Sequence, residues 1–399
     1  MSSPTPPTTT KLELRTAYGP VYRDVLNTPP RPCTDTEIPI IDLSNINSPD
    51  LSDRQALAAE VRAAAVGTGF FYVKNHGIEE AVIQKAKEQA LCFFKQPYEE
   101  KAKIDKSHSR YFNGYMGLKS SNISPGESVD VKESIAWRYE PEHDPDHPQP
   151  LSSIPAEVKP WIRGEPFVWE GTSHLPNFKT DTLAYWKSCL SLARKLVRVF
   201  ALSLSLPEDY FDSRVTYPGA DGLYNYYSPS TEAERSNNSV GLGSHTDLQL
   251  FTLLWQDMIG GLQVLNKEGQ WIMAVPVEGT IVVNIGDFMM RLCNDMYKST
   301  VHRVYNRATV ERISMPFFFG KILFFFSSRR SKGSANVAIG LNFNCVEGVI
   351  STCTDENNPP KYEPISCGDW CQLRFKSEND EFKEKAAMAK APSAVVVKA

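Results

Sequence analysis

A histidine and a carboxylate stand two residues apart where the chain passes from a polar segment into an apolar one. The polar "ERSNNSVG" precedes "GLGSHTDLQLFTLL", which contains His245 and Asp247. On a strand, residues i and i+2 project from the same face, so both side chains can reach one point in space. A lone histidine at a strand end is more often structural, and "TD" is common in turns. A functional site therefore needs a third group from elsewhere.

A second histidine, in a later strand, can supply the missing ligand. His302 lies in the β-branched segment "KSTVHRVYN", and a jelly roll can bring strands that are distant in sequence side by side. The set His-x-Asp…His would place two imidazoles and one carboxylate on one side of a metal and leave positions open, as in non-haem Fe(II) oxygen chemistry. Zinc also accepts two histidines and a carboxylate, so these ligands alone do not decide the metal.

An arginine and a serine follow in a pattern suited to binding an anion. Arg312 and Ser314 in "ERIS" are again i and i+2 on one strand face. A guanidinium beside a hydroxyl can bind a carboxylate in bidentate fashion. The alternative is a surface salt bridge, but the apolar "ISMPFFFG" should bury this end of the strand. A buried arginine needs an anion, and one carboxylate of a dicarboxylic co-substrate would serve.

The elements that must position these residues change in type along the chain. Helix signals cover 52–69, 79–96 and about 181–205, the last with a long apolar stripe. "EIPIIDLS" and "FFYVKNHGI" read as strands, and from residue 222 onward short strands alternate with turns. Residues 105–180 are rich in Pro, Gly and Ser and are predicted to be irregular. Helices first and strands later indicate an α+β chain that ends in a β-sandwich or jelly roll.

Composition restricts the class of partner. The net charge is −4 and no basic block occurs, which argues against nucleic acid and anionic membranes. The eight cysteines are scattered without paired CxxC sets, so a zinc ribbon or disulfide framework is not expected. The N-terminus lacks the apolar stretch of a signal peptide, and no apolar run is long enough to span a bilayer. We expect a soluble cytoplasmic protein, a monomer or weak homo-oligomer, with a small-molecule substrate.

Taken together, these segments point to a known family. The chain resembles the Fe(II)- and 2-oxoglutarate-dependent oxygenases of the isopenicillin N synthase-like superfamily. The resemblance is carried, in the family's order, by "IPIIDLS", "GFFYVKNHGI", "NYYSP", "GSHTDLQLFTLLWQD", "VNIGDFMMRLCND", "YKSTVHRV" and "ERISMPFFF". It implies an α+β fold with a double-stranded β-helix, or jelly-roll, core, N-terminal helices and a long supporting helix.

The resemblance also assigns roles to residues. It implies His245, Asp247 and His302 as iron ligands and no further catalytic residue. It implies that Arg312 and Ser314 bind the distal carboxylate of 2-oxoglutarate, and that Asn225 and Tyr227 complete that pocket. Small residues in "GLGSHTD" would let the backbone pass close to the metal. The implied reaction consumes dioxygen and converts 2-oxoglutarate to succinate, with hydroxylation, desaturation or ring formation as the outcome.

The resemblance divides the chain into four parts. These are a flexible segment over 1–35, an N-terminal helical and strand region over 36–205, the jelly-roll domain over 206–350, and a C-terminal segment with a flexible tail over 351–399. Within the jelly roll, residues 321–341 depart from the family pattern, because "ILFFF" followed by "SSRRSKGS" suits neither a strand nor a compact turn. We interpret them as an atypical insertion, either a lid or a retained intron.

The substrate pocket and the reaction are less constrained by the sequence. Arg110, Tyr111 and Phe319 are candidate lining residues, and the overall pattern resembles fungal and bacterial tailoring enzymes of secondary metabolism. Three other functions stay open: an iron oxidase of the same fold that does not use 2-oxoglutarate, a zinc hydrolase, and an inactive binding homologue damaged by the insertion. The Asn-x-Tyr pair argues against the first, and the lack of a general base beside the triad argues against the second.

Overall fold

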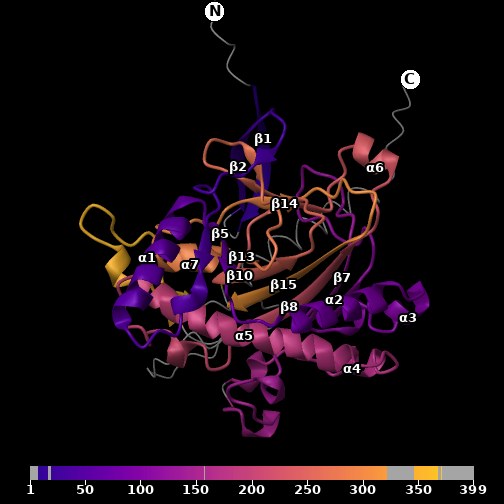
Figure 1. Cartoon of the computed structure of the whole chain (residues 1–399), viewed down its shortest axis with the longest axis horizontal. Helices are drawn as coiled ribbons and strands as arrows, with labels where there is room; N and C mark the ends of the chain where they lie inside the picture. Colours follow the sequence, from indigo (N-terminus) through magenta and orange to yellow (C-terminus); the bar gives the residue numbers. More distant parts are fainter. Residues whose placement is uncertain (1–7, 17–18, 157, 321–345, 367–369, 371–399) are drawn as a thin grey trace, which may run out of the picture.

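The computed structural model describes residues 8–16, 19–156, 158–320, 346–366 and 370 (Figure 1). Its largest element is a sheet of eight strands: β4 (Ile40–Asp42), β5 (Phe70–Lys74), β6 (Gly114–Met116), β7 (Glu133–Trp137), β8 (Gly219–Tyr227), β10 (Phe251–Gln256), β13 (Ile281–Ile285) and β15 (Arg312–Gly320). Their order is β4-β5-β13-β10-β15-β8-β7-β6, with β4 and β5 parallel and all other neighbours antiparallel. Strands from both halves of the chain therefore share one sheet.

A second sheet packs against the inner face of the first. Its five strands are β3 (Arg31–Pro32), β9 (Leu242–His245), β11 (Leu262–Leu265), β12 (Trp271–Met273) and β14 (His302–Val304), in the order β3-β12-β11-β14-β9. Buried apolar side chains of both sheets form one cluster, with Phe70 and Val282 from the first sheet and Val264 and Ile272 from the second. Two packed sheets of this kind form a jelly-roll core.

Helices cover the outer face of the large sheet. The three long ones are α1 (Leu51–Gly67), α2 (Glu80–Phe94) and α5 (Phe178–Ser203), and they match the three helices predicted from the sequence. Figure 1 shows α2 and α5 running beside β8 and β15. The Tyr185 hydroxyl of α5 donates to the Met315 carbonyl, and the Trp186 indole N–H donates to the Ala220 carbonyl, both at 3.0 Å. These bonds join α5 to the neighbouring strands β15 and β8.

The remaining elements are short. The other α-helices are α3 (Tyr98–Ala102), α4 (Phe167–Gly171), α6 (Glu232–Ser236) and α7 (Asp287–Leu292), and single 3₁₀ turns cover Leu43–Asn45, Lys106–His108, Pro141–His143, Leu151–Ser153, Lys159–Trp161, Asp212–Arg214 and Ser351–Cys353. A C-terminal strand pair is formed by β16 (Val346–Glu347) and β17 (Ile365–Ser366). Within the described part of the chain, no helix has the length and apolar character needed to cross a membrane.

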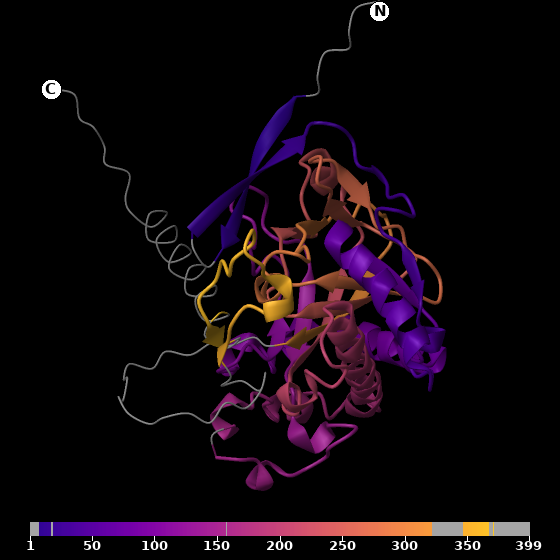
Figure 2. The same cartoon turned by 90° about the vertical axis from the view of Figure 1, so that its left-hand side faces the viewer.

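The N-terminal segment differs from the flexible 1–35 expected from the sequence. β1 (Thr9–Thr16) and β2 (Gly19–Leu26) form an antiparallel hairpin, which Figure 2 shows in indigo at the top of the molecule. Leu14 and Val25 are buried in a cluster with Trp271 of the second sheet. Burial of each such side chain stabilises the fold by about 1.5–3 kcal/mol, which the Pro/Thr-rich composition did not reveal.

The region 105–180 also contains structure that the sequence did not predict. β7 lies inside the large sheet, and all five of its residues are buried. A strand buried on both faces shows no alternation of polar and apolar residues, so "ESIAW" lacked the usual strand signal. The predicted insertion at 321–341 lies outside the described residues.

The strand register gathers polar side chains on the inner face of the large sheet. Arg312 is directly opposite Tyr227, and Ser314 is directly opposite both Asn225 on one side and Gln256 on the other. Directly opposed residues of an antiparallel pair project from the same face. The Arg-x-Ser and Asn-x-Tyr pairs therefore share one surface, and that surface faces the second sheet.

Candidate metal centre

Three ligand side chains converge at the edge where β9 and β14 pair. His245 ends β9, His302 begins β14, and the two residues are directly opposite in the register. The carboxylate Oδ1 of Asp247 lies 3.6 Å from His245 Nε2 and 3.7 Å from His302 Nε2. One ligand atom from each residue lies within 4.8 Å of the others. The three residues predicted from the sequence thus form one compact donor set.

Hydrogen bonds on the far side of each imidazole fix its orientation. His245 Nδ1 lies 2.8 Å from the Gly243 carbonyl oxygen, and His302 Nδ1 lies 3.1 Å from the Thr300 carbonyl oxygen. A carbonyl can only accept, so each Nδ1 carries a proton, and Nε2 is the nitrogen of each ring that faces Asp247. This is the arrangement in which metal-binding histidines are usually held.

The carboxylate of Asp247 is held in the same way. Its Oδ2 accepts hydrogen bonds from the Thr252 hydroxyl and from Asn284 Nδ2, the latter at 2.7 Å. Its Oδ1 is the oxygen that faces the two imidazoles. Thr252 and Asn284 are opposite each other on β10 and β13, so two strands of the large sheet orient this ligand.

Burial and mutual charge set protonation states that suit a metal. Burial, together with the charge of His302, lowers the pKa of His245 to about 3. Burial raises the pKa of Asp247, but the neighbouring histidines and the bonds from Asn284 and Thr252 outweigh it, and the net pKa is lowered. A neutral imidazole and an ionised carboxylate are the forms that coordinate a metal.

Arg312 is a buried cation without an anionic partner among the described residues. It is only 1% exposed, and its Nη2 donates to Gln256 Oε1 at 3.2 Å. Its Nε and Nη1 have no hydrogen-bond partner in the same part of the chain. The guanidinium stacks on the Tyr227 ring, 4.8 Å from its centroid. An unpaired buried guanidinium is costly, so this arrangement is suited to an anionic ligand.

The other predicted co-substrate residues surround this guanidinium. Ser314 and Tyr227 are buried, and burial raises the pKa of Tyr227, although the charge of Arg312 and hydrogen bonding with Ser314 partly oppose this. The Asn225 side-chain oxygen accepts from Ser134 Oγ at 2.7 Å and from Lys132 Nζ at 3.0 Å. Its oxygen is therefore already bonded, and only its amide N–H groups remain to donate to a ligand.

These residues fit Fe(II) and 2-oxoglutarate. Two imidazoles and one carboxylate form the facial set typical of non-haem iron. Thr252, which holds Asp247, and Gln256, which holds Arg312, are four residues apart on one face of β10, about 13 Å along the strand. That spacing leaves room for a five-carbon dicarboxylate between the metal ligands and the guanidinium.

The three residues predicted to line the substrate pocket do not lie together beside the triad in the described structure. Phe319 is not a lining residue: it is fully buried on the outer face of β15, with its ring centroid 5.2 Å from that of Phe251 in the core under the helices. Arg110 is exposed, and its backbone N–H donates to Glu165. Tyr111 is half-buried, with the Arg163 guanidinium 5.3 Å from its ring centroid. The described contacts give neither Arg110 nor Tyr111 a position beside the triad.

The glycines of "GLGSHTD" have a different role from the one expected. A side chain at Gly243 would meet the Ser124 Cβ at 2.8 Å, and one at Gly241 would meet the Tyr227 ring at 3.0 Å. The close approach is therefore to a covering loop and to an aromatic ring rather than to the metal site.

Several residues of the site gave no signal in the sequence. Thr252, Asn284, Gln256, Lys132 and Ser134 act only through the strand register, which pairs segments far apart in the chain. Alternation along β10 could have placed Thr252 and Gln256 on one face. Lys132 and Ser134 stand in a segment predicted to be irregular, so no periodicity was available for them.

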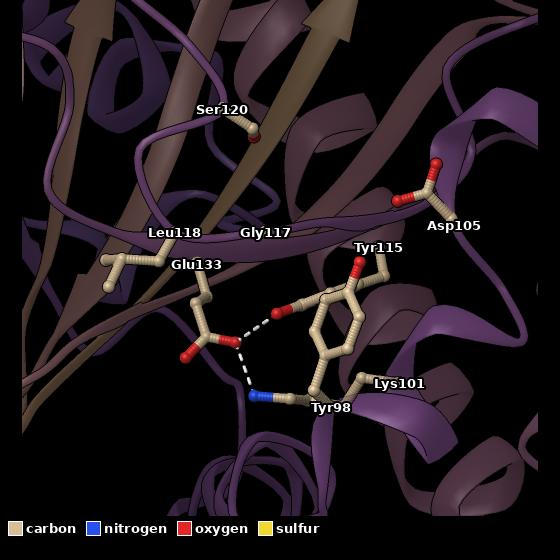
Figure 3. A pocket seen from close by; sticks show the side chains of 8 residues that line it. All are labelled: Tyr98, Lys101, Asp105, Tyr115, Gly117, Leu118, Ser120 and Glu133. Atoms are coloured by element: carbon tan, nitrogen blue, oxygen red, sulfur yellow. Dashed lines mark hydrogen bonds and ion pairs between the residues drawn. The ribbon is translucent and has the colours of Figure 1, made fainter.

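A separate surface pocket lies on the opposite side of β7. It has a volume of about 400 Å³ and is lined by Tyr98, Lys101, Asp105, Tyr115, Gly117, Leu118, Ser120 and Glu133 (Figure 3). Glu133 accepts from the Lys101 ammonium and the Tyr115 hydroxyl there. None of the residues around the triad lines this pocket, so we regard it as distinct from the candidate metal centre.

Comparison with known proteins agrees with this geometry. Residues 38–157 match the family described as the N-terminal region of non-haem dioxygenases in morphine synthesis, and residues 222–321 match the 2OG-Fe(II) oxygenase superfamily. The 2-oxoglutarate-Fe(II) type oxidoreductase ppzC of Metarhizium rileyi is 41% identical over 92% of this chain and 95% of its own. Homoarginine-6-hydroxylase 2-ODD-C23.1 of Arabidopsis thaliana is 33% identical over 71% of this chain and 84% of its own.

Solved structures of similar fold include complexes with alpha-KG, which is 2-oxoglutarate. A full-length Neurospora crassa protein, solved in complex with alpha-KG and thymine, is 26% identical, with a TM-score of 0.64 over 86% of this chain and 97% of that one. The complex of the same protein with alpha-KG and without thymine is 27% identical and also has a TM-score of 0.64, over 87% of this chain and 98% of that one.

Proposed function

The chain belongs to the 2-oxoglutarate-Fe(II) oxygenase superfamily, and from this premise we propose how its residues divide the work. It is an oxidoreductase that uses Fe(II), 2-oxoglutarate and dioxygen and acts on a small molecule. We propose that His245, Asp247 and His302 bind the iron. We propose further that 2-oxoglutarate is bound by Arg312 and by the three residues near it on the inner face of the large sheet: Ser314, Tyr227 and Asn225.

The protein's contribution is to bind, orient and exclude water. Bound iron, 2-oxoglutarate and dioxygen supply the oxidising chemistry, with succinate and carbon dioxide as the co-products. Arg312 orients the co-substrate by holding its distal carboxylate, which places its other end at the triad. The paired strands β9 and β14 hold the imidazoles, and Phe70 packs edge-on against His302 with ring centroids 5.3 Å apart. This packing keeps water from one side of the metal ligands.

The observation that carries the proposal is the buried guanidinium of Arg312, which has no anionic partner among the described residues. It lies on the same inner face of the large sheet as Thr252 and Asn284, which hold Asp247 of the triad. Similarity to a named 2-oxoglutarate-Fe(II) oxidoreductase favours 2-oxoglutarate over an oxidase without a dicarboxylic co-substrate, in which an anionic group of the substrate would have to compensate this cation. Lack of a general base near the triad, within the described part of the chain, remains the argument against a hydrolase.

The reaction and its biological setting are the finer part of the proposal. We propose oxidation of a C–H bond of a small organic molecule in secondary metabolism, with hydroxylation as the first expectation and desaturation or ring formation as variants. Similarity over nearly the whole length to the fungal oxidoreductase ppzC supports this setting. Relatives that are named for homoarginine and solved with thymine indicate that the fold accepts chemically different substrates, so the pocket must select.

Organisation and location complete the proposal. We retain 36–205, 206–350 and 351–399 as sequence units and expect the first two to fold together, because their strands share one sheet. We propose that α5 is the helix that supports this sheet. We expect a monomer or weak homo-oligomer that binds no nucleic acid. Cytoplasmic location is supported by five free cysteines among the described residues: Cys33, Cys92, Cys189, Cys293 and Cys353.

The test is an equilibrium binding experiment without oxygen. Fe(II) and 2-oxoglutarate are added anaerobically to the purified protein, and the visible metal-to-ligand charge-transfer band is recorded. We expect a band that needs both components and that is absent from the Asp247→Ala variant. A protein that binds Fe(II) but gives no band at any 2-oxoglutarate concentration would contradict the assignment of the co-substrate pocket.

A further inference from the structure

Lys132, just before β7, is a second buried cation on the inner face of the sheet. It is 9% exposed, and its ammonium donates to Ser134 Oγ at 2.6 Å and to Asn225 Oδ1 at 3.0 Å. Both acceptors are uncharged. Among the described residues, no carboxylate lies within 4 Å of the Lys132 nitrogen. A buried ammonium with only neutral partners has lost its hydration without gaining a counter-ion.

The neighbouring residue shows what a paired lysine looks like in this fold. Glu133 projects to the other face of β7, where it binds the Lys101 ammonium in a buried ion pair (Figure 3). Lys101 is as buried as Lys132, at 7% exposed, but it has its own carboxylate. The two lysines are separated by the sheet, so Glu133 cannot serve both. The difference between them is the counter-ion.

Asp130, an acid close to Lys132 in the chain, does not form an ion pair with it. Asp130 is buried, and its Oδ1 accepts from the Gly243 backbone N–H at 2.9 Å and its Oδ2 from the Ser121 hydroxyl at 2.7 Å. Burial lowers the pKa of Lys132 to about 8, although the charge of Asp130 raises it. Near pH 7 the ammonium is therefore still charged, but it is not fully compensated.

The position of Lys132 connects it to the oxygenase site. Ser134 is directly opposite Asn225, and Asn225 is directly opposite Ser314. Glu133 is opposite Tyr226, so the next residue pair along the ladder sets Lys132 beside Tyr227, on the side away from Arg312. The charge of Lys132 also acts on His245, lowering the pKa of that histidine. The ammonium thus borders both the co-substrate residues and the triad.

The charges around the site indicate which kind of ligand suits Lys132. Under the proposed function, Fe(II) and Arg312 together carry as much positive charge as Asp247 and the 2-oxoglutarate dianion carry negative charge. Lys132 and Asp130 then remain on this face among the described residues, but the Asp130 oxygens are bonded to Ser121 and Gly243 and make no ion pair with the ammonium. The three ammonium N–H groups have only two acceptors, Ser134 and Asn225, in the described part of the chain, and a carboxylate is the anionic acceptor that suits the third, with the Asn225 N–H groups as further donors.

We propose that Lys132, held by Ser134 and with the Asn225 amide N–H groups beside it, binds a carboxylate of the substrate, so that the enzyme selects small carboxylic acids. This inference rests on the proposed function. The other source of a carboxylate in the site is 2-oxoglutarate itself, whose binding is measured separately in the test.

The experiment uses the full chain loaded anaerobically with Fe(II) and 2-oxoglutarate. The probes are phenylacetate, 3-phenylpropionate, benzoate and L-homoarginine, each compared with its own primary amide. Binding is read as a change in the charge-transfer band, and succinate formation is read afterwards in air. Lys132→Met removes the charge and keeps the length, Lys132→Arg keeps a charge, and Lys74→Met removes an exposed lysine whose ammonium pairs with Asp42.

We expect at least one acid, and none of the amides, to perturb the band in the wild type and the Lys74→Met variant. In Lys132→Met that acid should bind at least about 10-fold more weakly, with a much smaller loss of affinity for 2-oxoglutarate, and Lys132→Arg should restore part of the affinity for the acid. A loss of 2-oxoglutarate affinity in Lys132→Met as large as the loss for the acid would assign the ammonium to the co-substrate and overturn the inference. So would amides that act as well as acids, or a wild type that responds to none of the acids. Failure to form the band at all would instead refute the proposed function.

Discussion

His245 and His302 lie directly opposite each other on β9 and β14, with ring centroids 4.3 Å apart. Their separation is therefore set by the hydrogen-bonded ladder of two strands and not by a loop. The pair lies next to an irregularity in the register between His302 and Val304. Asp247, which follows β9, needs support from the other sheet to complete the set, and Thr252 and Asn284 provide it.

Loss of any one metal ligand should abolish turnover. His245→Ala, Asp247→Ala and His302→Ala each leave two ligands of a three-ligand site, and we expect no succinate formation above background and severely weakened Fe(II) binding. Fe(II) titration and succinate assays check this, with circular dichroism to show that each variant folds. His76→Ala is the matched control, because His76 is a half-buried histidine whose Nδ1 only accepts from the Ile78 backbone N–H. Near-native turnover in any ligand variant would refute the triad.

Arg312→Lys should weaken 2-oxoglutarate binding and leave iron binding intact. Lysine keeps the charge but loses the planar fork that can hold a carboxylate at two points. Loss of one charged hydrogen bond of this kind is worth about 1.5–3 kcal/mol, so we expect the 2-oxoglutarate requirement to rise roughly 10- to 100-fold. The control is Arg303→Lys on β14, whose guanidinium stacks on Trp271, 3.7 Å from the ring centroid. Unchanged co-substrate dependence in Arg312→Lys would make Arg312 purely structural.

The sequence predicted the donor residues well because their signals are local. His245 with Asp247 and Arg312 with Ser314 are i, i+2 pairs, and strand alternation alone puts each pair on one face. The same rule explains the error at Phe319, which is an odd number of residues from Arg312 and so projects from the outer face. The alternation that supported Arg312 would have excluded Phe319 had it been extended along the strand.

Elements that depend on long-range pairing escaped prediction. β7 is buried on both faces and carries no alternation, yet it contributes Ser134 to the inner face next to Asn225. The β1–β2 hairpin depends on burial of Leu14 and Val25 against a strand from the other half of the chain. Such contacts can be predicted only when the register of distant strands is known, and no local sequence pattern specifies that register.

Acid should remove the ion pair between Arg31 of β3 and Glu37, which precedes β4. The Arg31 guanidinium, with bonds from Thr34 and Asn266, lowers the pKa of Glu37 to about 2. The folded pKa lies below the unfolded one, so this stabilisation is present above about pH 4.5 and is lost as the pH falls toward 2. The Arg31 side of the pair is exposed, so we expect the loss of stability to be small. Urea unfolding should show Glu37→Gln less stable than the wild type at pH 7, with the difference shrinking as the pH falls through this window. A difference that does not depend on pH would mean that the charge of Glu37 is not involved.

Thr252 and Asn284 should act on the metal through Asp247 and not on the substrate. Their bonds to Oδ2 direct Oδ1 toward the imidazoles, and loss of such support typically costs about 10- to 100-fold in metal affinity. We therefore expect Thr252→Ala and Asn284→Ala to weaken Fe(II) binding by this factor while turnover largely recovers at saturating iron. Thr252→Ser keeps the hydroxyl and should bind Fe(II) nearly as the wild type does, which separates the hydrogen bond from the packing of the methyl group. Equal iron affinity in Thr252→Ala and Thr252→Ser, with only thermal stability reduced, would show that Thr252 supports the sheet and not the carboxylate.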